Sequence, residues 1–412
     1  MNRPHETPEL IAKINGLWAG DGLQSEFQRE VANHLKRNDS RKFPGAQPVS
    51  FAKQHLAELK TQDYYVCEKT DGLRVLMYLT YDEREGVKHP VIYLIDRRND
   101  FYYVNGLRFP IPEDPRFEKF HVDTILDGEL VEDKLPNGKT LIKYLAFDCM
   151  LYQGKDLRER PLDKRLGYMK EFVLRPYNKW LRDVPENQRE PQPFKVEDKK
   201  TEFSYSLAAM FNEIIPQVKQ LHGNDGLIFT CKGTNYVSGT DPHILKWKPP
   251  NENTVDFLMQ IQWPVVDPDP NDPDQSPQQD YFGFPAKIEL FIFHGRNQDY
   301  SYVGDLYVTP EEWENMKELD QPLQDAIVEC YLEDLEKDVG HPANGGSLGT
   351  GRRWRFYRLR EDKDEANHIS TFDSVKVSIE DHVTQQDLLD HADEIRAAWK
   401  SRDARRQSTR AA

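Results

Sequence analysis

Apolar side chains in the first 60 residues recur every three or four positions. That spacing gathers them on one face of a helix, so the segment is predicted to be mostly helical. From residue 64 the pattern changes to short β-prone runs separated by turns, with one helical interval near 205–221. The mixture predicts an α+β core built on antiparallel sheets. The helical positions are Ile11, Ile14, Leu17, Trp18, Phe27, Val31 and Leu35. The expected strands span 64–67, 73–80, 91–95, 124–131, 141–148, 226–230 and 244–247.

A second set of strands is expected after a linker at 247–253, which is rich in proline and asparagine. Strands interrupted by a helix suit a five-stranded OB barrel. We expect strands at 255–262, 287–293, 302–308 and 354–359, a helix near 322–337, an acidic proline-rich surface loop at 267–274 and a flexible glycine-rich connection at 340–351.

A further helix is predicted after Thr384, which together with Asp387 three residues later resembles a capping pair, although Asp replaces the usual Glu or Gln. Its apolar stripe is expected to pack on a domain, and it consists of Leu388, Leu389, Ala392, Ile395 and Trp399. The residues from 400 to 412 carry five basic side chains against one acid, and 401–412 is predicted to be disordered. The expected division of the chain is therefore 1–254, 255–380, 381–400 and 401–412.

Composition limits the class of protein. The chain has 412 residues, of which 38% are hydrophobic, and a net charge of -15. A negative net charge disfavours tight binding along an RNA backbone, because such binding depends on lysine and arginine side chains that contact the phosphates. Four widely spaced cysteines form no zinc-knuckle or disulfide pattern, so a reducing compartment is expected. No run approaches the ~18 apolar residues of a membrane span, and we expect a soluble, intracellular protein.

The segment 67–74, Cys-Glu-Lys-Thr-Asp-Gly-Leu-Arg, places an amine at the end of a strand. Lys69 follows a β-prone run and precedes Asp71 and Gly72, a tight-turn dipeptide. This layout predicts a lysine that points into a cleft. A lysine amine becomes a nucleophile when its pKa falls through burial or nearby positive charge. A solvated lysine before a hairpin turn gives the same pattern.

Other charged residues stand at the ends of expected core strands. Glu129 lies in the run Asp-Gly-Glu-Leu-Val, and Asp225 precedes Gly-Leu-Ile-Phe. A carboxylate in such a place is costly to bury unless it meets a cation or a hydroxyl. Lys246 and Lys248, two apart on a strand, put both ammonium groups on one face. Turn caps and solvated strand faces stay open as explanations for each of these residues taken alone.

Taken in order, these motifs resemble the covalent nucleotidyltransferases, and in particular the mRNA capping guanylyltransferases of the fungal capping enzyme alpha subunits. The resemblance covers most of the chain. The matching segments are 43–51, 67–74, 95–97, 127–131, 144–148, 225–229, 245–250 and 360–363, followed by Asn367.

The resemblance implies a fold and a reaction. The fold is an α+β nucleotidyltransferase domain with ATP-grasp-like antiparallel sheets and helices, followed by a C-terminal OB-fold barrel. The reaction transfers GMP from GTP, through a covalent lysyl-N-GMP intermediate on Lys69, to the 5′-diphosphate end of nascent pre-mRNA, and releases pyrophosphate.

The resemblance also implies a role for each candidate residue. Lys69 would be the catalytic nucleophile, and a divalent cation, Mg²⁺ or Mn²⁺, would be held by Asp225 and Glu129. Phe147 would stack on guanine, and Arg360 with Lys363 would act on the β- and γ-phosphates, which requires the second domain to close over the cleft. The nucleotide contacts would come from Thr70, Arg74, Arg97, Glu129, Phe147, Lys246, Lys248, Arg360 and Lys363. The supporting residues would be Asp71, Gly72, Asp362 and Asn367.

Two other functions stay open from the sequence. An ATP-dependent polynucleotide ligase shares the lysine-Asp-Gly chemistry, although ligases typically have Glu-Gly where this chain has Asp225 and Gly226. A non-catalytic adaptor that tethers polymerase tails or RNA ends would be expected to lack Lys69 or the later lysine pair, and both are present.

The resemblance further implies partners and a location. An RNA 5′-triphosphatase, the beta subunit of the capping enzyme, would supply the diphosphate RNA end. The phosphorylated C-terminal repeat tail of RNA polymerase II would recruit the complex, and the protein would act in the nucleus without contact with a membrane.

Overall fold

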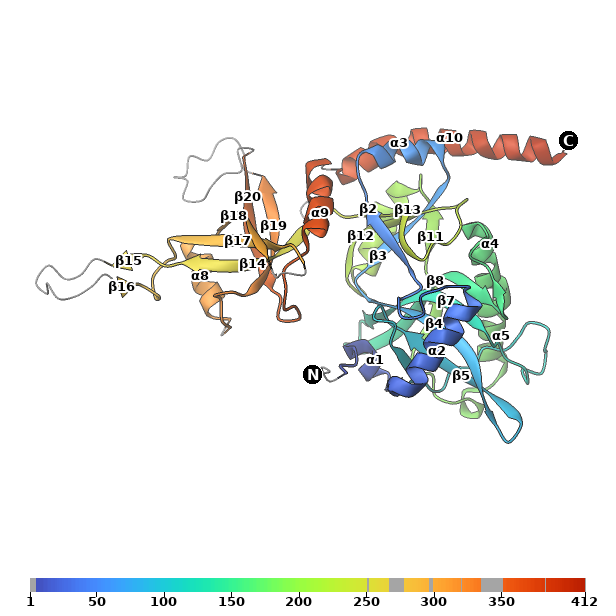
Figure 1. Ribbon diagram of the computed structural model, residues 1–412. Helices are drawn as coiled ribbons and strands as arrows, with labels where there is room; N and C mark the ends of the chain where they lie inside the picture. The colour runs from blue at the N-terminus through green and yellow to red at the C-terminus, as the bar shows by residue number, and fades with distance from the viewer. Residues whose placement is uncertain are drawn as a thin grey trace, which may run out of the picture. The chain divides into compact units, whose positions relative to one another are not determined.

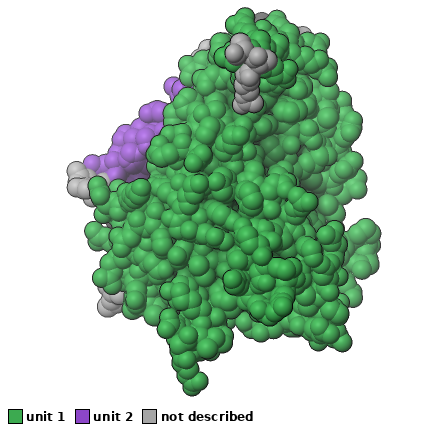
Figure 2. Space-filling view, turned by 90° about the vertical axis from the view of Figure 1, so that its right-hand side faces the viewer, with its two compact units in different colours: residues 1–247, 386–412 green, residues 248–385 purple. Residues whose placement is uncertain are grey.

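The computed structural model (Figure 1) describes residues 5–249, 252–266, 278–295, 299–319, 321–334, 351–381 and 383–411. The chain forms two compact units, which Figure 2 shows in separate colours: residues 1–247 with 386–412, and residues 248–385. The first break thus falls after Trp247, earlier than the expected boundary at 254. The expected loop at 267–274, and all but the last residue of the expected connection at 340–351, lie outside the described residues.

The first unit is built on two sheets (Figure 1). The larger has the order β1-β6-β5-β4-β7-β8-β10, with β9 paired to β8. Its pairs are antiparallel except for β10 with β8. The strands are β1 (Leu17–Trp18), β4 (Leu73–Arg84), β5 (Val87–Ile95), β6 (Phe101–Val104), β7 (Thr124–Lys134), β8 (Thr140–Tyr152), β9 (Lys155–Asp156) and β10 (Lys195–Asp198).

Both faces of the larger sheet are covered, which explains the unbroken apolar run of β4. Val75 and Met77 point to a core shared with α1 (Glu9–Lys13), the helical turns 168–174 and α5 (Arg175–Asp183). Leu76 and Tyr78 point to the opposite core, against α2 (Gly20–His34).

The smaller sheet carries the predicted lysine. Its order is β11-β3-β12-β13-β2, so β3 lies between β11 and β12. The strands are β2 (Ala46–Ser50), β3 (Tyr64–Thr70), β11 (Thr201–Phe203), β12 (Asn224–Cys231) and β13 (Gly239–Trp247). The other helices of the first unit include α3 (Gln54–Thr61), α6 (Leu207–Ala209), α7 (Ile215–Val218) and α4 (Leu162–Gly167), which packs against β8 of the larger sheet. The helical interval near 205–221 is confirmed, whereas β2 lies within the segment predicted to be mostly helical.

His222 connects the two sheets. Its Nδ1 lies 2.7 Å from Oδ1 of Asp133 on β7, and its Nε2 lies 3.2 Å from Oε2 of Glu68 on β3. Burial disfavours the imidazolium, but hydrogen bonds to Glu68 and Asp133 outweigh burial and raise the pKa of His222 above its usual value.

This raised pKa predicts how stability depends on pH. A raised folded-state pKa contributes stability that is fully present below the unfolded pKa of about 6.5 and is lost as pH rises through the folded value. The decrease in melting temperature caused by His222→Gln should therefore be largest near pH 6 and become smaller at higher pH. Thermal denaturation across that range measures it, with the exposed His89→Gln as the control. A decrease in melting temperature that does not change with pH would contradict the pairing of a charged His222 with Glu68 and Asp133.

The second unit is a closed five-stranded barrel of order β14-β17-β18-β20-β19, which confirms the expected OB-fold architecture. Its strands are β14 (Thr254–Gln262), β17 (Lys287–Phe293), β18 (Tyr300–Tyr307), β19 (Ile327–Asp334) and β20 (Arg352–Leu359). A short ribbon, β15 (Val265–Val266) with β16 (Gln278–Gln279), and a helix, α9 (Ile369–Asp381), complete it.

The prediction of a helix near 322–337 is wrong. Residues 327–334 form β19, because this segment pairs with both β14 and β20 and so closes the barrel. The helix of the barrel is α8 (Pro310–Lys317), which begins at a capping box formed by Thr309 and Glu312.

The C-terminal helix α10 (Gln385–Ala411) packs on the first unit, and Leu388, Ile395 and Trp399 of its expected stripe are buried. The expected disorder of 401–412 is wrong, because residues 401–411 continue the helix. Arg402 and Arg406, one helical turn apart, pair with the buried Asp63 and so fix this end. Among the described helices, none is both long and apolar enough to cross a membrane.

Candidate active site

A pocket lies where the two sheets of the first unit face each other. Strands β2, β3, β11, β12 and β13 supply one side, and β4, β7 and β8 supply the other. Of the predicted site residues, it is lined by Lys69, Thr70, Arg74, Arg97, Glu129 and Phe147. The lining residues that the sequence did not single out include Tyr65, Asp127, Asp148, Lys199, Thr201 and Tyr236.

Lys69 projects into this pocket from β3. Its Nζ donates to Oδ1 of Asp225 at 2.6 Å, which joins two predicted site residues 156 positions apart. The pairing of β12 with β3 is irregular between Asn224 and Leu227, and Gly226 there has φ of 142°, a conformation that favours glycine. The irregularity lets Asp225 reach Lys69.

The turn after Lys69 needs Gly72 for a close approach. A Cβ at this position would lie 2.5 Å from the carbonyl oxygen of Leu130 and 2.9 Å from Cγ of Glu129. The exposed Asp71 supports the turn through its backbone, since its N–H donates to the carbonyl of Gly223 at 2.9 Å. The lysine-bearing turn is thus pressed against β7, the strand that carries Glu129.

Glu129 is held by a lysine that the sequence did not reveal. Lys199 donates from Nζ to Glu129 Oε2 at 3.1 Å and also to the hydroxyl of Thr70, which in turn donates to Glu129. Burial would raise the pKa of Glu129, but the charge of Lys199 and these hydrogen bonds outweigh it, so the pKa is lowered. Lys199 lies in the charged run Glu-Asp-Lys-Lys, which in sequence has the character of a solvated surface turn.

Phe147 faces the pocket because β8 is irregular there. Asp127 pairs with Asp148 and Gly128 with Ala146, so Phe147 is the extra residue of a bulge. The ring lies under two cations, with the guanidinium carbon of Arg74 at 5.5 Å and Nζ of Lys199 at 5.7 Å from its centroid.

The two predicted arginines differ in the hydrogen bonds and ion pairs that they make with other described residues. Arg74 makes a two-point pair with the fully buried Asp127, at 3.1 and 2.6 Å, and donates to the carbonyl of Ala46. Arg97 is exposed and lines the pocket, and no hydrogen bond or ion pair joins its guanidinium to another described residue. Arg97 is therefore the better placed of the two to meet a phosphate.

The predicted lysine pair is divided between the units. Lys246 is on β13 opposite Ile228 of β12, which in turn is opposite Cys67 of β3. Because side chains opposite one another point to the same face, Lys246 shares the sheet face of Cys67 and Lys69. Lys248 is the first residue of the second unit.

The candidate residues of the second unit converge on Asp256, which the sequence did not single out. This buried carboxylate accepts from Arg360 at 3.0 and 3.1 Å, from Lys363, and from Asn367 at 3.2 Å. Arg360 also pairs with Asp362 at 2.8 and 2.7 Å, and this hydrogen bonding lowers the pKa of Asp362 to about 2.

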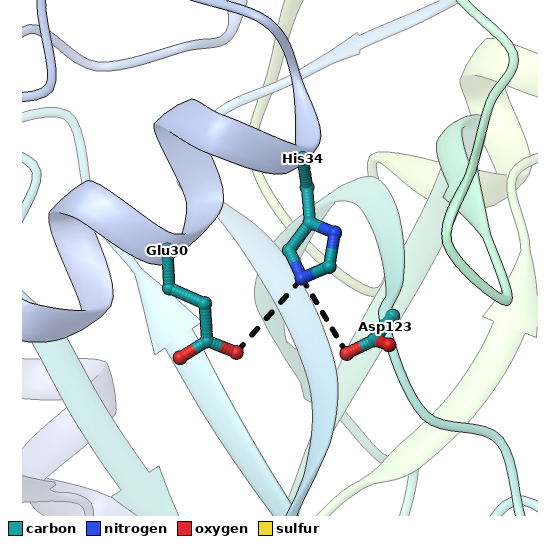
Figure 3. Close-up of side chains that lie close together, drawn as sticks. All are labelled: Glu30, His34 and Asp123. Atoms are coloured by element: carbon teal, nitrogen blue, oxygen red, sulfur yellow. Dashed lines mark ion pairs between the residues drawn. The ribbon is translucent and has the colours of Figure 1, made fainter.

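A separate group of possible metal ligands lies outside the pocket lining (Figure 3). His34 Nε2 is 3.9 Å from Glu30 and 3.5 Å from Asp123, and Tyr78 donates to Glu30 at 2.5 Å. These ion pairs connect the end of α2 to Asp123, the residue before β7. We therefore assign the group a structural role.

Comparisons with known proteins cover both units. A family model described as "mRNA capping enzyme, catalytic domain" matches residues 12–250, and one described as "mRNA capping enzyme, C-terminal domain" matches residues 252–389. An mRNA-capping enzyme subunit alpha of Neurospora crassa is 46% identical over 98% of this chain and 97% of that protein. Proteins of the same name from Schizosaccharomyces pombe and Saccharomyces cerevisiae are 43% and 35% identical, over 87% and 96% of this chain and 82% and 88% of theirs.

Among solved structures, a mycobacterial DNA ligase D complexed with ATP and MES covers 77% of this chain and 95% of its own. It is 15% identical with a TM-score of 0.37, a score too low to bear on function.

Proposed function

This chain belongs to the mRNA capping enzyme guanylyltransferase family of nucleotidyltransferases, and from that premise we propose that Lys69 carries GMP from GTP to the 5′-diphosphate end of RNA. The observation that carries the proposal is the position of the Lys69 amine, which enters a pocket between two sheets and meets Asp225 at 2.6 Å.

In the first half-reaction the Lys69 nitrogen attacks the α-phosphorus of GTP. The ammonium must first lose a proton, and Asp225 is a carboxylate within hydrogen-bond reach of it. The nitrogen lone pair forms a P–N bond while the bond from the α-phosphorus to the bridging oxygen breaks, and pyrophosphate leaves with that electron pair. Attack and departure must be in line, so the pocket works mainly by positioning and by neutralising charge.

The pocket residues divide this positioning among them. Phe147 offers a ring face for guanine, and Arg97 offers its guanidinium to phosphate oxygens, which its planar fork suits. Thr70 and Lys199 hold Glu129 at the edge of the pocket, where its carboxylate can accept from a ribose hydroxyl. Lys246, on the same sheet face as Lys69, adds positive charge.

Asp225 and Glu129 are the two predicted ligands of a divalent cation, and each contacts a lysine in this structure, Asp225 through Lys69 and Glu129 through Lys199. We assign Mg²⁺ or Mn²⁺ to these carboxylates together with phosphate oxygens. Such an ion neutralises charge on the phosphates, and it is normally held in proteins by one or two carboxylates plus phosphate oxygens.

In the second half-reaction a terminal phosphate oxygen of the diphosphate RNA attacks the GMP phosphorus. A P–O bond forms, the P–N bond breaks, and the Lys69 nitrogen takes up a proton. We assign Arg360 and Lys363 to the β- and γ-phosphates of GTP, which are present in the first half-reaction alone.

The same family relationship supports the remaining partners. The relatives are named as alpha subunits, a name that goes with a second subunit, and we propose that this subunit is an RNA 5′-triphosphatase. We further assign recruitment to the phosphorylated tail of RNA polymerase II and action to the nucleus, where that polymerase makes pre-mRNA.

Nucleotide choice tests the proposed function. The protein, incubated with a divalent ion and either α-³²P-GTP or α-³²P-ATP, should retain label through denaturing electrophoresis with GTP and not with ATP. Labelling by ATP with little labelling by GTP would replace this function with that of an ATP-dependent polynucleotide ligase.

A further inference from the structure

We propose that the C-terminal helix α10 is a positioning element of the nucleotide pocket. Through Trp399 it supports the end of the pocket that lies away from Lys69, and through Arg402 and Arg406 it fixes the start of the lysine-bearing strand. The inference rests on the proposed function, because it concerns how tightly that pocket takes GTP.

Trp399 packs into an aromatic cluster formed by β3, β11 and the turn that follows β11. The side chain is buried, and its ring centroid lies 5.1 Å from that of Phe203, 5.6 Å from Tyr205 and 6.1 Å from Tyr65. Tyr65 and Phe203 are opposite each other in the pairing of the two strands. The helix therefore contacts the sheet at the point where β3 begins.

Tyr65 carries this contact into the pocket. Along β3 alternate residues share a face, so Tyr65, Cys67 and Lys69 point the same way, and all three line the pocket. Four residues of strand span about 13 Å. An extended nucleotide covers most of that length between its α-phosphorus and the far edge of its base. With the phosphorus at Lys69, Tyr65 and the ring that supports it lie at the base end.

A second contact fixes the residue immediately before β3. Asp63 is buried, and Arg402 donates from Nε to its Oδ1 at 2.7 Å while Arg406 pairs with its other oxygen. Arg402 also donates to the backbone carbonyls of Lys60 at 2.5 Å and Gln62 at 3.3 Å. A buried carboxylate left without these cations would be costly and would draw in water.

Two further contacts join α10 to the first unit. Glu394 of α10 pairs with Lys60 of α3, and the two helices run side by side in Figure 1. Nζ of Lys232, which follows β12, lies 5.4 Å from the Trp399 ring centroid. Because α10 makes these contacts, it limits how far the Tyr65 end of β3 can move.

The test uses the full chain and measures covalent GMP formation at a series of GTP concentrations. Trp399→Ala should raise the half-saturating GTP concentration about tenfold and leave the rate at saturation within about threefold, because Lys69 and its neighbours are untouched. Trp399→Phe should restore most of the affinity, since it returns a ring to Tyr65. Arg405→Ala, an exposed position on the same helix, is the matched control and should behave as the wild type.

Loss of stability alone predicts a different result. If α10 only stabilises the fold, folded Trp399→Ala protein, checked by its melting temperature, should have the wild-type half-saturating concentration, and that result would overturn the proposal. If Trp399→Ala melts below the assay temperature, Trp399→Leu, which is apolar but has no ring, gives the same comparison.

The role of Asp63 is tested by combining variants. Arg402→Ala with Arg406→Ala should raise the half-saturating concentration, and adding Asp63→Asn should reverse part of that rise, because a neutral amide needs no cation. A further rise on adding Asp63→Asn would overturn the assigned route through Asp63. A wild-type chain that forms no adduct with GTP would instead contradict the proposed function.

Discussion

Lys69→Arg should abolish the covalent enzyme–GMP adduct while the protein keeps its fold. The guanidinium retains the positive charge and can still pair with Asp225, but it stays protonated near neutral pH and has no lone pair to attack the α-phosphorus. The expected loss is complete rather than partial, since no other group in the proposal forms the P–N bond. Retention of label after denaturing electrophoresis measures it, and a thermal melt of the same preparation checks the fold.

The control for this variant makes the same chemical change outside the pocket. Lys200→Arg, at an exposed position next to Lys199, should form the adduct at the wild-type rate. An adduct on the Lys69→Arg protein would mean that another lysine is the nucleophile, and the assignment of the pocket would fail with it.

Arg360→Ala and Lys363→Ala should each slow formation of enzyme–GMP by roughly 10²-fold or more, as expected for a charge clamp on developing pyrophosphate. Transfer of GMP from a preformed adduct to diphosphate-ended RNA should suffer much less, because the β- and γ-phosphates of GTP have left by then. Rates of the two half-reactions, measured separately on folded protein, give the comparison.

The barrel itself offers the rival explanation for these residues. Arg360 and Lys363 both pair with the buried Asp256, so their loss also leaves a carboxylate uncompensated. A purely structural role predicts lower stability with equal defects in both half-reactions or with none in either, and such a result would exclude the phosphate role. Arg358→Ala, which removes an exposed partner of Glu329 on the same barrel, controls for loss of one surface arginine.

Local patterns predicted much of the fold and several of the residues that line the pocket. The apolar runs of β4 and β7 and the Asp-Gly turn after Lys69 are short-range signals, and each marked an element that the structure contains. The resemblance to the capping guanylyltransferases is confirmed by the family models and the relatives.

The rest depended on contacts between distant segments. Lys199 enters the pocket because β10 and β11 join different sheets on either side of it, which nothing in its charged run indicates. Residues 327–334 form a strand because the barrel must close, and 401–411 is helical because two arginines meet a carboxylate more than 300 positions earlier. The Gly226 irregularity and the Phe147 bulge likewise arise from the register between strands.

GMP is proposed to be carried on the Lys69 nitrogen, and peptide mapping by mass spectrometry can locate it. Wild-type protein is incubated with GTP and a divalent ion and digested at or above neutral pH, because a P–N bond hydrolyses in acid. Fragmentation is then used to place the added GMP on one residue. We expect GMP on Lys69 and on no other lysine. GMP on Lys199, on Lys246 or on any other residue would contradict it.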